Sequence, residues 1–214
     1  MSDAAPVSPS STIDVGASIS YGWEAFKKYP AALILAFLVV WIGSGIVTGI
    51  GYVFDSFFLQ FLFNIAGTII AIVLAKGLVT IVLDVTKGQE PDLGKLLNGD
   101  NLVNYIIAGI IVGLLVTVGL ILCILPGLFA AVALQFTPYR VIDKGETAME
   151  ALAGSWALVK PQIGSLIVLM LALFVLNIVG AILCLVGLLV TSPLSAVAMA
   201  HAYRTASGEA PAAV

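Results

Sequence analysis

Long apolar runs fill most of this chain and limit its possible folds more than any other feature. Of its 214 residues, 61% are hydrophobic and 10% are charged. A soluble domain is about half apolar and about a quarter charged, so a soluble core could not bury this much apolar surface. The sequence therefore predicts an all-α membrane protein, with six transmembrane helices in three antiparallel hairpins and amphipathic helices at the cytoplasmic interface.

Polar residues, glycines and prolines divide the apolar sequence into six segments. A transmembrane helix needs about 20 apolar residues, and the fourth and sixth segments fall slightly short of that length. We expect a single membrane domain at 13–206, a disordered tail at 1–12 and a second tail at 207–214. The predicted spans are residues 31–54, 57–84, 103–124, 127–143, 163–185 and 187–204.

Two amphipathic segments, 15–29 and 147–159, end beside prolines and are predicted to be helices on the membrane surface. Each carries a tryptophan near basic residues, which is typical of an anchor at the lipid headgroups. A third, more polar surface element covers 87–104. The predicted interfacial anchors are Trp23, Lys27, Lys28, Arg140, Trp156, Lys160 and Arg204.

The positions of the basic residues predict the orientation. With six spans, all nine Lys and Arg residues fall on the side of the N-terminus. Short loops rich in Lys and Arg remain in the cytoplasm, so both termini are predicted to be cytoplasmic. The nine residues are Lys27, Lys28, Lys76, Lys87, Lys95, Arg140, Lys144, Lys160 and Arg204.

A Leu-Pro-Gly sequence at 125–127 is predicted to turn the chain at the outer interface between the third and fourth spans. Pro126 lacks an N–H group and disfavours helical geometry in the residue before it, and Gly127 tolerates a reversed backbone. We expect this turn to pack beside the segment 184–190. Pro193 is predicted to kink the sixth helix.

Short sequence matches indicate an internal repeat. The segment 119–127, GLILCILPG, is similar to 180–188, GAILCLVGL. Lys-Gly at 87–88 and at 144–145, and Ser-Gly at 207–208, follow the second, fourth and sixth predicted spans. We expect a unit of surface helix, odd span, tight outer turn, even span and Gly-Glu exit, used about three times. The alternative is that sequence rich in Gly and Leu matches itself easily.

The two cysteines, Cys123 and Cys184, occupy matching positions in the two similar segments. We expect two free apolar thiols, and a disulfide in an oxidising compartment is the alternative.

Three neutral polar residues, Asn64, Gln135 and Asn177, lie within the predicted spans. We expect them to bond helices to one another, and the alternative is that they line a substrate cavity. Lys76 is the one basic residue well inside a predicted span. Its side chain can extend to the headgroups from near a helix end, although an intramembrane charge is also a candidate for function.

His201 and Arg204 lie one helical turn apart near the end of the sixth predicted span. We expect an interfacial pair that anchors this helix end, and a proton relay or anion site is the alternative. The sequence contains no HExxH, GxSxG or Walker motif and no paired carboxylates within a span. We therefore expect no enzyme activity, cofactor or metal site. The net charge of −3 argues against nucleic acid as a partner.

Several short motifs follow one another in a recognisable order: Gly22-Trp23, Phe26 to Lys28, Leu125 to Gly127, Phe136 to Tyr139, Val141 to Gly145, Ser155-Trp156 and Pro193 to Arg204. In this order they resemble a broad group of bacterial six-helix membrane proteins. The group includes the membrane domain of some glycerophosphoryl diester phosphodiesterases and related uncharacterised inner-membrane proteins. The resemblance spans nearly the whole chain and implies this fold and a bacterial cytoplasmic membrane. The sequence lacks the phosphodiesterase domain with its acidic metal ligands, so the resemblance does not imply that activity.

These observations predict a membrane protein that acts as a scaffold, assembly factor or accessory subunit in a membrane complex. Its predicted partners are the lipid bilayer and either a membrane protein or further copies of itself. The alternative is a small permease or lipid-handling protein with a cavity among the helical repeats. Convergence of the polar residues Asn64, Gln135 and Asn177 on one open cavity would favour that alternative.

Overall fold

The computed structural model describes residues 12–51, 53, 56–183 and 186–213. Predictions for residues 1–11, the outer turn at Asp55 and the thiol of Cys184 lie outside these ranges. Within them the chain is helical and contains no strand. The elements are α1 (Val15–Lys28), α2 (Pro30–Gly51), α3 (Phe57–Thr86), η1 (Leu93–Leu97), α4 (Leu102–Leu122), α5 (Ile124–Ala133), α6 (Thr137–Lys144), α7 (Ala148–Val159), η2 (Lys160–Gln162), α8 (Ile163–Ile182) and α9 (Leu188–Ala206).

Five helical stretches of the described chain are long and apolar enough to cross a membrane, which confirms the predicted class of helical membrane protein. They are Pro30–Val47, Phe57–Thr86, Leu102–Leu122, Ile124–Lys144 and Ala148–Ile182. The sixth predicted span corresponds to α9, which falls outside this set.

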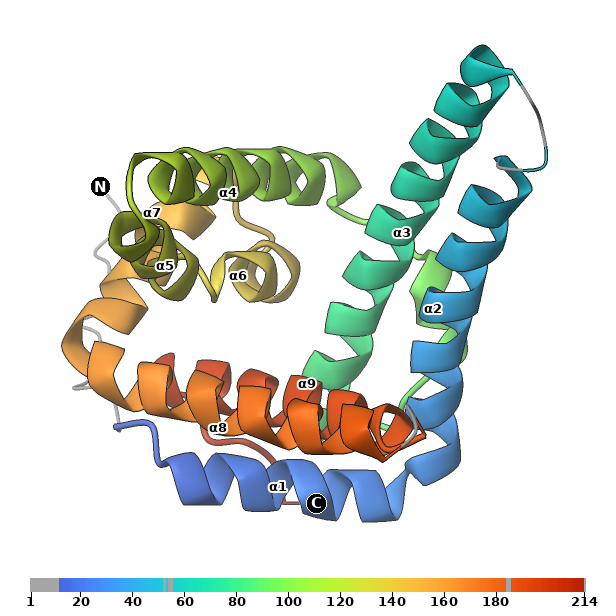
Figure 1. Cartoon of the computed structure of the whole chain (residues 1–214). Helices are drawn as coiled ribbons and strands as arrows, with labels where there is room; N and C mark the ends of the chain where they lie inside the picture. Colours follow the sequence, from blue (N-terminus) through green and yellow to red (C-terminus); the bar gives the residue numbers. More distant parts are fainter. Residues whose placement is uncertain (1–11, 52, 54–55, 184–185, 214) are drawn as a thin grey trace.

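Figure 1 shows α2 and α3 side by side, running across the direction of α1, α8 and α9. The helix α4 lies on the side of the molecule away from α1, and it packs against α5, α6 and α7. The consecutive helices α2 and α3, α4 and α5, and α8 and α9 are neighbours, as hairpins require. However, the helix pairs run in differing directions, and the predicted arrangement of six spans in three antiparallel hairpins is not confirmed.

The helix α9 forms the centre of the core. It packs against α1, α2, α3 and α8, and none of its 19 residues is exposed. Small side chains such as Ala198 and Ala202 allow this close approach, and both are 0% exposed. Close packing with α1 depends on Gly22, because a Cβ added there would lie 2.6 Å from the carbonyl oxygen of Leu194. The helix continues through Pro193.

The surface segments predicted at 15–29 and 147–159 are the helices α1 and α7. Asp14 caps α1, because its side chain accepts a hydrogen bond from the Ala17 N–H at 2.9 Å. A capping box begins α7, with the Thr147 and Glu150 side chains each bonded to the other residue's backbone N–H. These caps satisfy backbone N–H groups that a helix leaves unpaired in its first turn.

The turn predicted at Pro126-Gly127 lies earlier in the chain. The helix α4 ends at Leu122, Cys123 is extended with φ −170° and ψ 149°, and α5 begins at Ile124. The prediction is corrected because a proline ring clashes with the carbonyl group four residues before it. For Pro126 that residue is Leu122, so the helix breaks directly after Leu122 and Pro126 lies in the first turn of α5, where its missing N–H costs little.

The fourth predicted span, 127–143, was expected to be one helix and is two. The residues between α5 and α6 form a turn, and Pro138 in the first turn of α6 again lies four residues after the break. Ser155 of α7 bonds both sides of this interruption. Its hydroxyl accepts from the Phe136 N–H at 3.1 Å and donates to the Ala133 carbonyl at 3.0 Å. The backbone groups released by the break are thus satisfied away from water.

Two hairpins close on pairs of glycines. A Cβ added at Gly119 of α4 would lie 2.7 Å from the Gly127 Cα in α5. A Cβ added at Gly187 would lie 2.7 Å from the Gly180 Cα in α8. Gly127 therefore serves close helix packing, and it is not among the described glycines with a positive φ. Glycine is needed at both hairpins because nothing larger fits between the backbones.

The helices α3, α6 and α9 end in the same way. Each is followed by a glycine with a positive φ: 77° at Gly88, 66° at Gly145 and 74° at Gly208. This left-handed geometry is the common glycine cap at a helix C-terminus. The described chain has no other glycine with a positive φ.

The C-terminal segment predicted as a tail at 207–214 makes specific contacts. The Ala212 N–H donates to the Thr86 carbonyl at 2.9 Å, at the end of α3. Tyr21 of α1 donates its hydroxyl to the Ala212 carbonyl at 3.0 Å. Burial raises the pKa of Tyr21 to about 12, so this group is a neutral donor at physiological pH. These bonds hold the segment against α1 and α3.

Candidate functional site

Paired charges gather where α3, α6 and α9 end. Asp143 of α6 has a side chain that is 4% exposed, and its carboxylate accepts a hydrogen bond from the Tyr203 hydroxyl at 3.0 Å. Lys87, directly after α3, pairs with the same carboxylate at 2.6 Å. Burial of a carboxylate is costly unless charges and donors compensate it, and both are present here.

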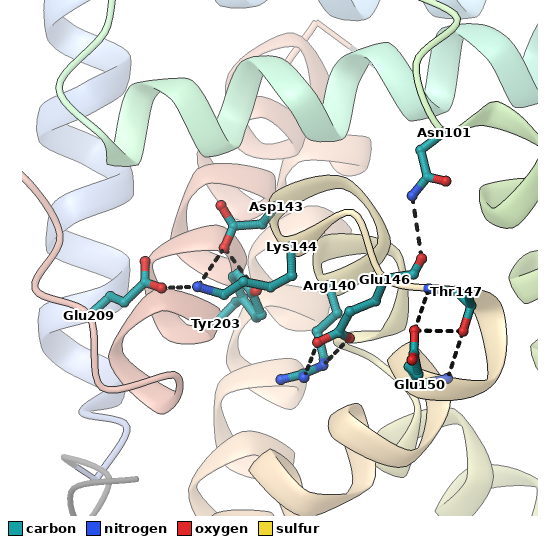
Figure 2. A network of polar contacts seen from close by, with 9 residues as sticks. All are labelled: Asn101, Arg140, Asp143, Lys144, Glu146, Thr147, Glu150, Tyr203 and Glu209. Carbon is teal, nitrogen blue, oxygen red and sulfur yellow. Dashed lines mark hydrogen bonds and ion pairs between the residues drawn. The ribbon is translucent and has the colours of Figure 1, made fainter. Parts of the chain in front are cut away.

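The cluster extends to the segment that follows α9 (Figure 2). Lys144 forms ion pairs with both Asp143 and Glu209. Glu209 also pairs with Arg204 of α9 at 2.9 Å. The cluster therefore ties the ends of three helices to one another.

Next to this cluster, Arg140 and Glu146 form a two-pronged ion pair (Figure 2). Arg140 Nε lies 2.8 Å from Glu146 Oε2, and a second bond joins the other oxygen to the guanidinium. Asn101, before α4, donates to the Val141 carbonyl at 2.8 Å and to the Glu146 carbonyl at 3.3 Å. Arg140 and Arg204, both predicted as anchors for headgroups, are thus paired within the protein.

Lys95 of η1 pairs with Asp84 of α3 at 2.6 Å. This hydrogen bond raises the pKa of Lys95 above its ordinary value. Because the folded pKa is the higher one, the pair stabilises the protein at neutral pH. This contribution is lost only as the pH rises above the ordinary range for lysine.

Lys76 lies deeper in α3 and is buried, with 2% of its surface exposed. Its ammonium donates a hydrogen bond to the Asn98 carbonyl at 2.8 Å. The neighbouring Gly77 packs against the backbone of Leu96, since an added Cβ would lie 2.4 Å from the Leu96 Cα. In this structure Lys76 therefore binds the loop after η1 and does not extend outward.

The three neutral polar residues of the predicted spans lie on different elements. Asn64 donates to the Gln60 carbonyl within α3 at 2.7 Å. Asn177 of α8 donates to the Ser195 hydroxyl of α9 at 2.8 Å. Gln135 lies in the turn between α5 and α6 and is half-buried. They do not converge, and none lines either of the cavities described below.

His201 faces α1. Its Nδ1 lies 3.1 Å from the hydroxyl of the buried Ser18, and its ring lies 4.5 Å from the ring of Tyr21, measured between centroids. The Ser18 hydroxyl donates to the Asp14 carbonyl at 2.9 Å. Arg204, one helical turn further along α9, pairs instead with Glu209.

The remaining predicted anchors lie on α1, α7 and η2. Trp23 is exposed and stacks on Phe26, with ring centroids 6.1 Å apart. Trp156 packs edge-on against Phe129 of α5 at 5.5 Å. The three lysines lie at the surface: Lys27 pairs with Glu24, Lys28 lies over the ring of Tyr29, and Lys160 is exposed.

Two apolar cavities flank the interrupted helix α5–α6. One is about 620 Å³ and lies between α3, α4 and α6, with walls that include Ile72, Ile106 and Gly109. The other is about 800 Å³ and lies between α5 and α8, with walls that include Phe129, Met170 and Phe174. Their linings suit hydrocarbon and not a polar solute.

Thr137 of α6 lines the smaller cavity and is 0% exposed. Its hydroxyl oxygen is buried and has no hydrogen-bond partner among the residues that the structure describes. Thr137 is not among the functional candidates that the sequence pattern indicates. The sequence does contain a signal for a helix break at this position. Thr-Pro at 137–138 lies within the predicted span 127–143, and a proline there indicates that the helix is interrupted.

The described residues contain no group of three or more His, Cys, Asp or Glu side chains placed to hold a metal ion. Cys123 is a free, exposed cysteine. Cys184, its partner in the alternative disulfide, lies outside the described ranges. The polar side chains that the fold gathers are thus the ion-paired residues at the ends of α3, α6 and α9. The two cavities described above are lined mainly by apolar residues.

Residues 4–213 match the model of a family described as a domain of unknown function, DUF7847. The uncharacterized protein Mb2590 of Mycobacterium bovis is 25% identical over 228 residues, covering 93% of this chain and 70% of the relative. The uncharacterized protein Rv2560 of Mycobacterium tuberculosis is 24% identical over the same shares. No solved structure matches the chain. Neither the family description nor these relatives links it to glycerophosphoryl diester phosphodiesterases. Since the family model covers nearly the whole sequence, the chain belongs to the DUF7847 family.

Proposed function

We propose that this protein is a non-catalytic integral membrane protein that acts as a scaffold, assembly factor or accessory subunit in a membrane complex. The observation that carries the proposal is that Asn64 and Asn177, two of the three neutral polar residues predicted within the spans, bond within or between helices. Asn64 bonds within α3, and Asn177 joins α8 to α9. Polar groups used in this way hold helices together and do not form a route for a polar solute.

The proposal includes six spans with both termini in the cytoplasm of a bacterial cell. The meeting of the ends of α3, α6 and α9 in one charged cluster supports it, because three hairpins with exits on one side require that arrangement. The helix α1 reaches the same end through Tyr21. The basic residues Lys87, Lys144 and Arg204 are thus gathered together, as the positive-inside rule expects.

We also propose that the fold is a unit repeated three times. The left-handed glycines Gly88, Gly145 and Gly208 support this, because they occur after the second helix of each proposed unit. The glycine pairs at two of the hairpins give similar support. The surface helices α1 and α7 would then lie at the cytoplasmic interface, with Trp23 and Trp156 at the headgroups.

A second function, lipid handling, has one observation in its favour. The helix α5–α6 is interrupted, and an apolar cavity lies on each side of it. Interrupted helices that line cavities are typical of substrate sites in transporters. The apolar walls indicate a lipid in place of a polar substrate.

The test of the proposed function is purification of the full chain from its native membrane in a mild detergent, followed by mass spectrometry. The scaffold role predicts a membrane protein that copurifies in a fixed ratio and survives a second affinity step. A matched sample carrying Glu209→Gln shows whether the charged cluster supports that association. Recovery of the chain without a stoichiometric protein, at every detergent strength tried, would contradict the scaffold role.

A further inference from the structure

The cavity between α3, α4 and α6 differs from ordinary lipid-facing surface. Its volume of about 620 Å³ lies inside the range of about 300–1,000 Å³ that is typical of small-molecule sites. The walls come mainly from α3, with Ala71 and Ile72, and from α4, with Ile106 and Ile110, and Pro138 of α6 completes the lining. A single extended hydrocarbon chain matches such a slot better than a compact ligand does.

The cavity lining includes three residues with hydroxyl groups, and one of them, Thr68, already donates its hydroxyl to the Asn64 carbonyl. The other two are Thr137 and Tyr105, and Tyr105 is near the start of α4. The Thr137 hydroxyl is buried and unpartnered within the described part of the chain. A buried hydroxyl without a partner is costly, and a protein rarely retains one unless something satisfies it. An oxygen acceptor on a bound molecule would do so.

The lining also gives the cavity a direction. From Thr68 to Ala75 on α3, and from Tyr105 to Val112 on α4, the walls each extend about 10 Å along a helix. One leaflet of the hydrocarbon core is about 15 Å thick. The cavity lining is therefore about two thirds as long as one leaflet, which is enough for a large part of one acyl chain lying along the middle of α3.

We propose that this cavity binds one acyl chain of a membrane glycerophospholipid, with the ester carbonyl of that chain accepting a hydrogen bond from the Thr137 hydroxyl. The lipid fills the space between α3 and α4 and completes the packing of α6. This goes beyond the proposed scaffold function and does not depend on a protein partner.

The larger cavity between α5 and α8 is the internal comparison. Its described lining consists of apolar residues such as Leu125, Ile167 and Phe174, without an unpartnered hydroxyl. Lipid there has no fixed polar contact and exchanges with the bilayer. The chain therefore retains one lipid in detergent and not two.

Two matched variants test the site. Gly109 of α4 lines the cavity, and Gly113, one turn further on, does not; an added Cβ meets no atom within 4 Å at either position. Gly109→Leu therefore fills the cavity, and Gly113→Leu makes the same change to the helix outside it. A third variant, Thr137→Val, removes the hydroxyl and keeps the shape of the side chain.

The full chain is stripped of lipid in detergent and titrated with dioleoyl phosphatidylglycerol, and native mass spectrometry counts the bound lipids. We expect one retained lipid in the parent and in Gly113→Leu. Each methylene withdrawn from an apolar site weakens binding roughly fourfold, so loss of two or more in Gly109→Leu weakens it about fifteenfold or more. Loss of the hydrogen bond in Thr137→Val weakens it roughly fivefold.

The unmodified chain gives an independent test if a variant fails to fold. A phosphatidylcholine with a photoreactive diazirine in its acyl chain should cross-link to peptides that contain 68–75 and 105–112. Equal lipid retention by Gly109→Leu and Gly113→Leu would overturn the proposal. Absence of any retained lipid in the parent, or cross-links spread evenly over all the exposed helices, would overturn it as well.

Discussion

The helices α4 and α9 have similar lengths and opposite surroundings. Of the 21 residues of α4, only Ala108 and Gly119 are buried, and its exposed side chains are apolar apart from Thr117. Among the 19 residues of α9, none is exposed, although the helix contains Ser, Thr, His and Arg. The first helix depends on an apolar solvent, and the second depends on the protein around it.

This difference explains why α9 is missing from the five stretches that are apolar enough to cross a membrane. Hydropathy measures how well a helix suits lipid on all sides. A helix enclosed by others needs small side chains and satisfied polar groups instead. Ala198 supplies the close contact, and Ser195 supplies a bond to Asn177. Composition therefore identifies lipid-facing helices more readily than the central one.

The largest expected effect is at Tyr203 of α9. It is 0% exposed, stacks on Tyr139 at 5.4 Å and donates to Asp143. Tyr203→Ala should lower the free energy of unfolding by about 3–5 kcal/mol, as loss of a core aromatic does. Leu114→Ala on α4, where the side chain is 62% exposed, should change it by less than about 1 kcal/mol. Thermal unfolding in detergent compares the two, and equal destabilisation would remove the distinction between α4 and α9.

A smaller effect is expected from crowding the contact between α1 and α9. A side chain at Gly22 meets the Leu194 carbonyl oxygen, so Gly22→Leu should cost about 1–3 kcal/mol or more, as overpacking does. Gly113→Leu in α4 has open space around it and should be nearly neutral. Proteolysis at rising temperature measures both. If Gly22→Leu proves as stable as the parent, α1 does not pack closely on α9.

Removal of a polar contact between helices should have a more modest effect. Asn177→Leu keeps the approximate volume and removes the bond to Ser195 of α9, with an expected cost of about 0.6–2 kcal/mol. Asn64→Leu removes a bond within α3 alone and should cost less. The order of the two melting temperatures checks this, and the reverse order would place the stabilising polar contact in α3.

The smallest expected effect is in the charged cluster. The Glu209 side chain is half-buried at 31% exposed, and its partners Lys144 and Arg204 are 38% and 12% exposed. Ion pairs that are open to solvent contribute about 0–1 kcal/mol. Glu209→Gln should therefore lower stability by less than about 1 kcal/mol, and raised salt should diminish the difference. Thermal unfolding at low and high salt measures it. A loss as large as that expected from Tyr203→Ala would show that the cluster, and not the core, holds α9.

The sequence predicted helix positions well where periodic apolar residues meet a clear break. The starts at Pro30, Phe57 and Ile163 illustrate this, since each follows a polar or proline-containing segment. The sequence predicts the break at Pro126-Gly127, and the structure has it at Cys123, three to four residues earlier. The reason is that the Pro126 ring clashes with the carbonyl of Leu122. The break before α6 was missed, although Pro138 is its signal.

Site features were harder to predict because their partners are distant along the chain. Lys76 bonds to Asn98, and Tyr203 bonds to Asp143, 60 residues away. Thr137 lies beside α3 and α4, which are distant from it along the chain, so the local sequence does not indicate that its hydroxyl is buried. By contrast, the three glycine exits were visible in the sequence because each is a local cap with a local cause.

The most direct test of the account is labelling of the unmodified protein in its native membrane with a photoactivatable reagent dissolved in the lipid phase. Peptide mapping by mass spectrometry then compares α4 with α9. We expect strong labelling over residues 107–122 and little over 191–203, because α4 faces lipid and α9 is enclosed by α1, α2, α3 and α8. Equal labelling of the two helices, or stronger labelling of α9, would contradict it.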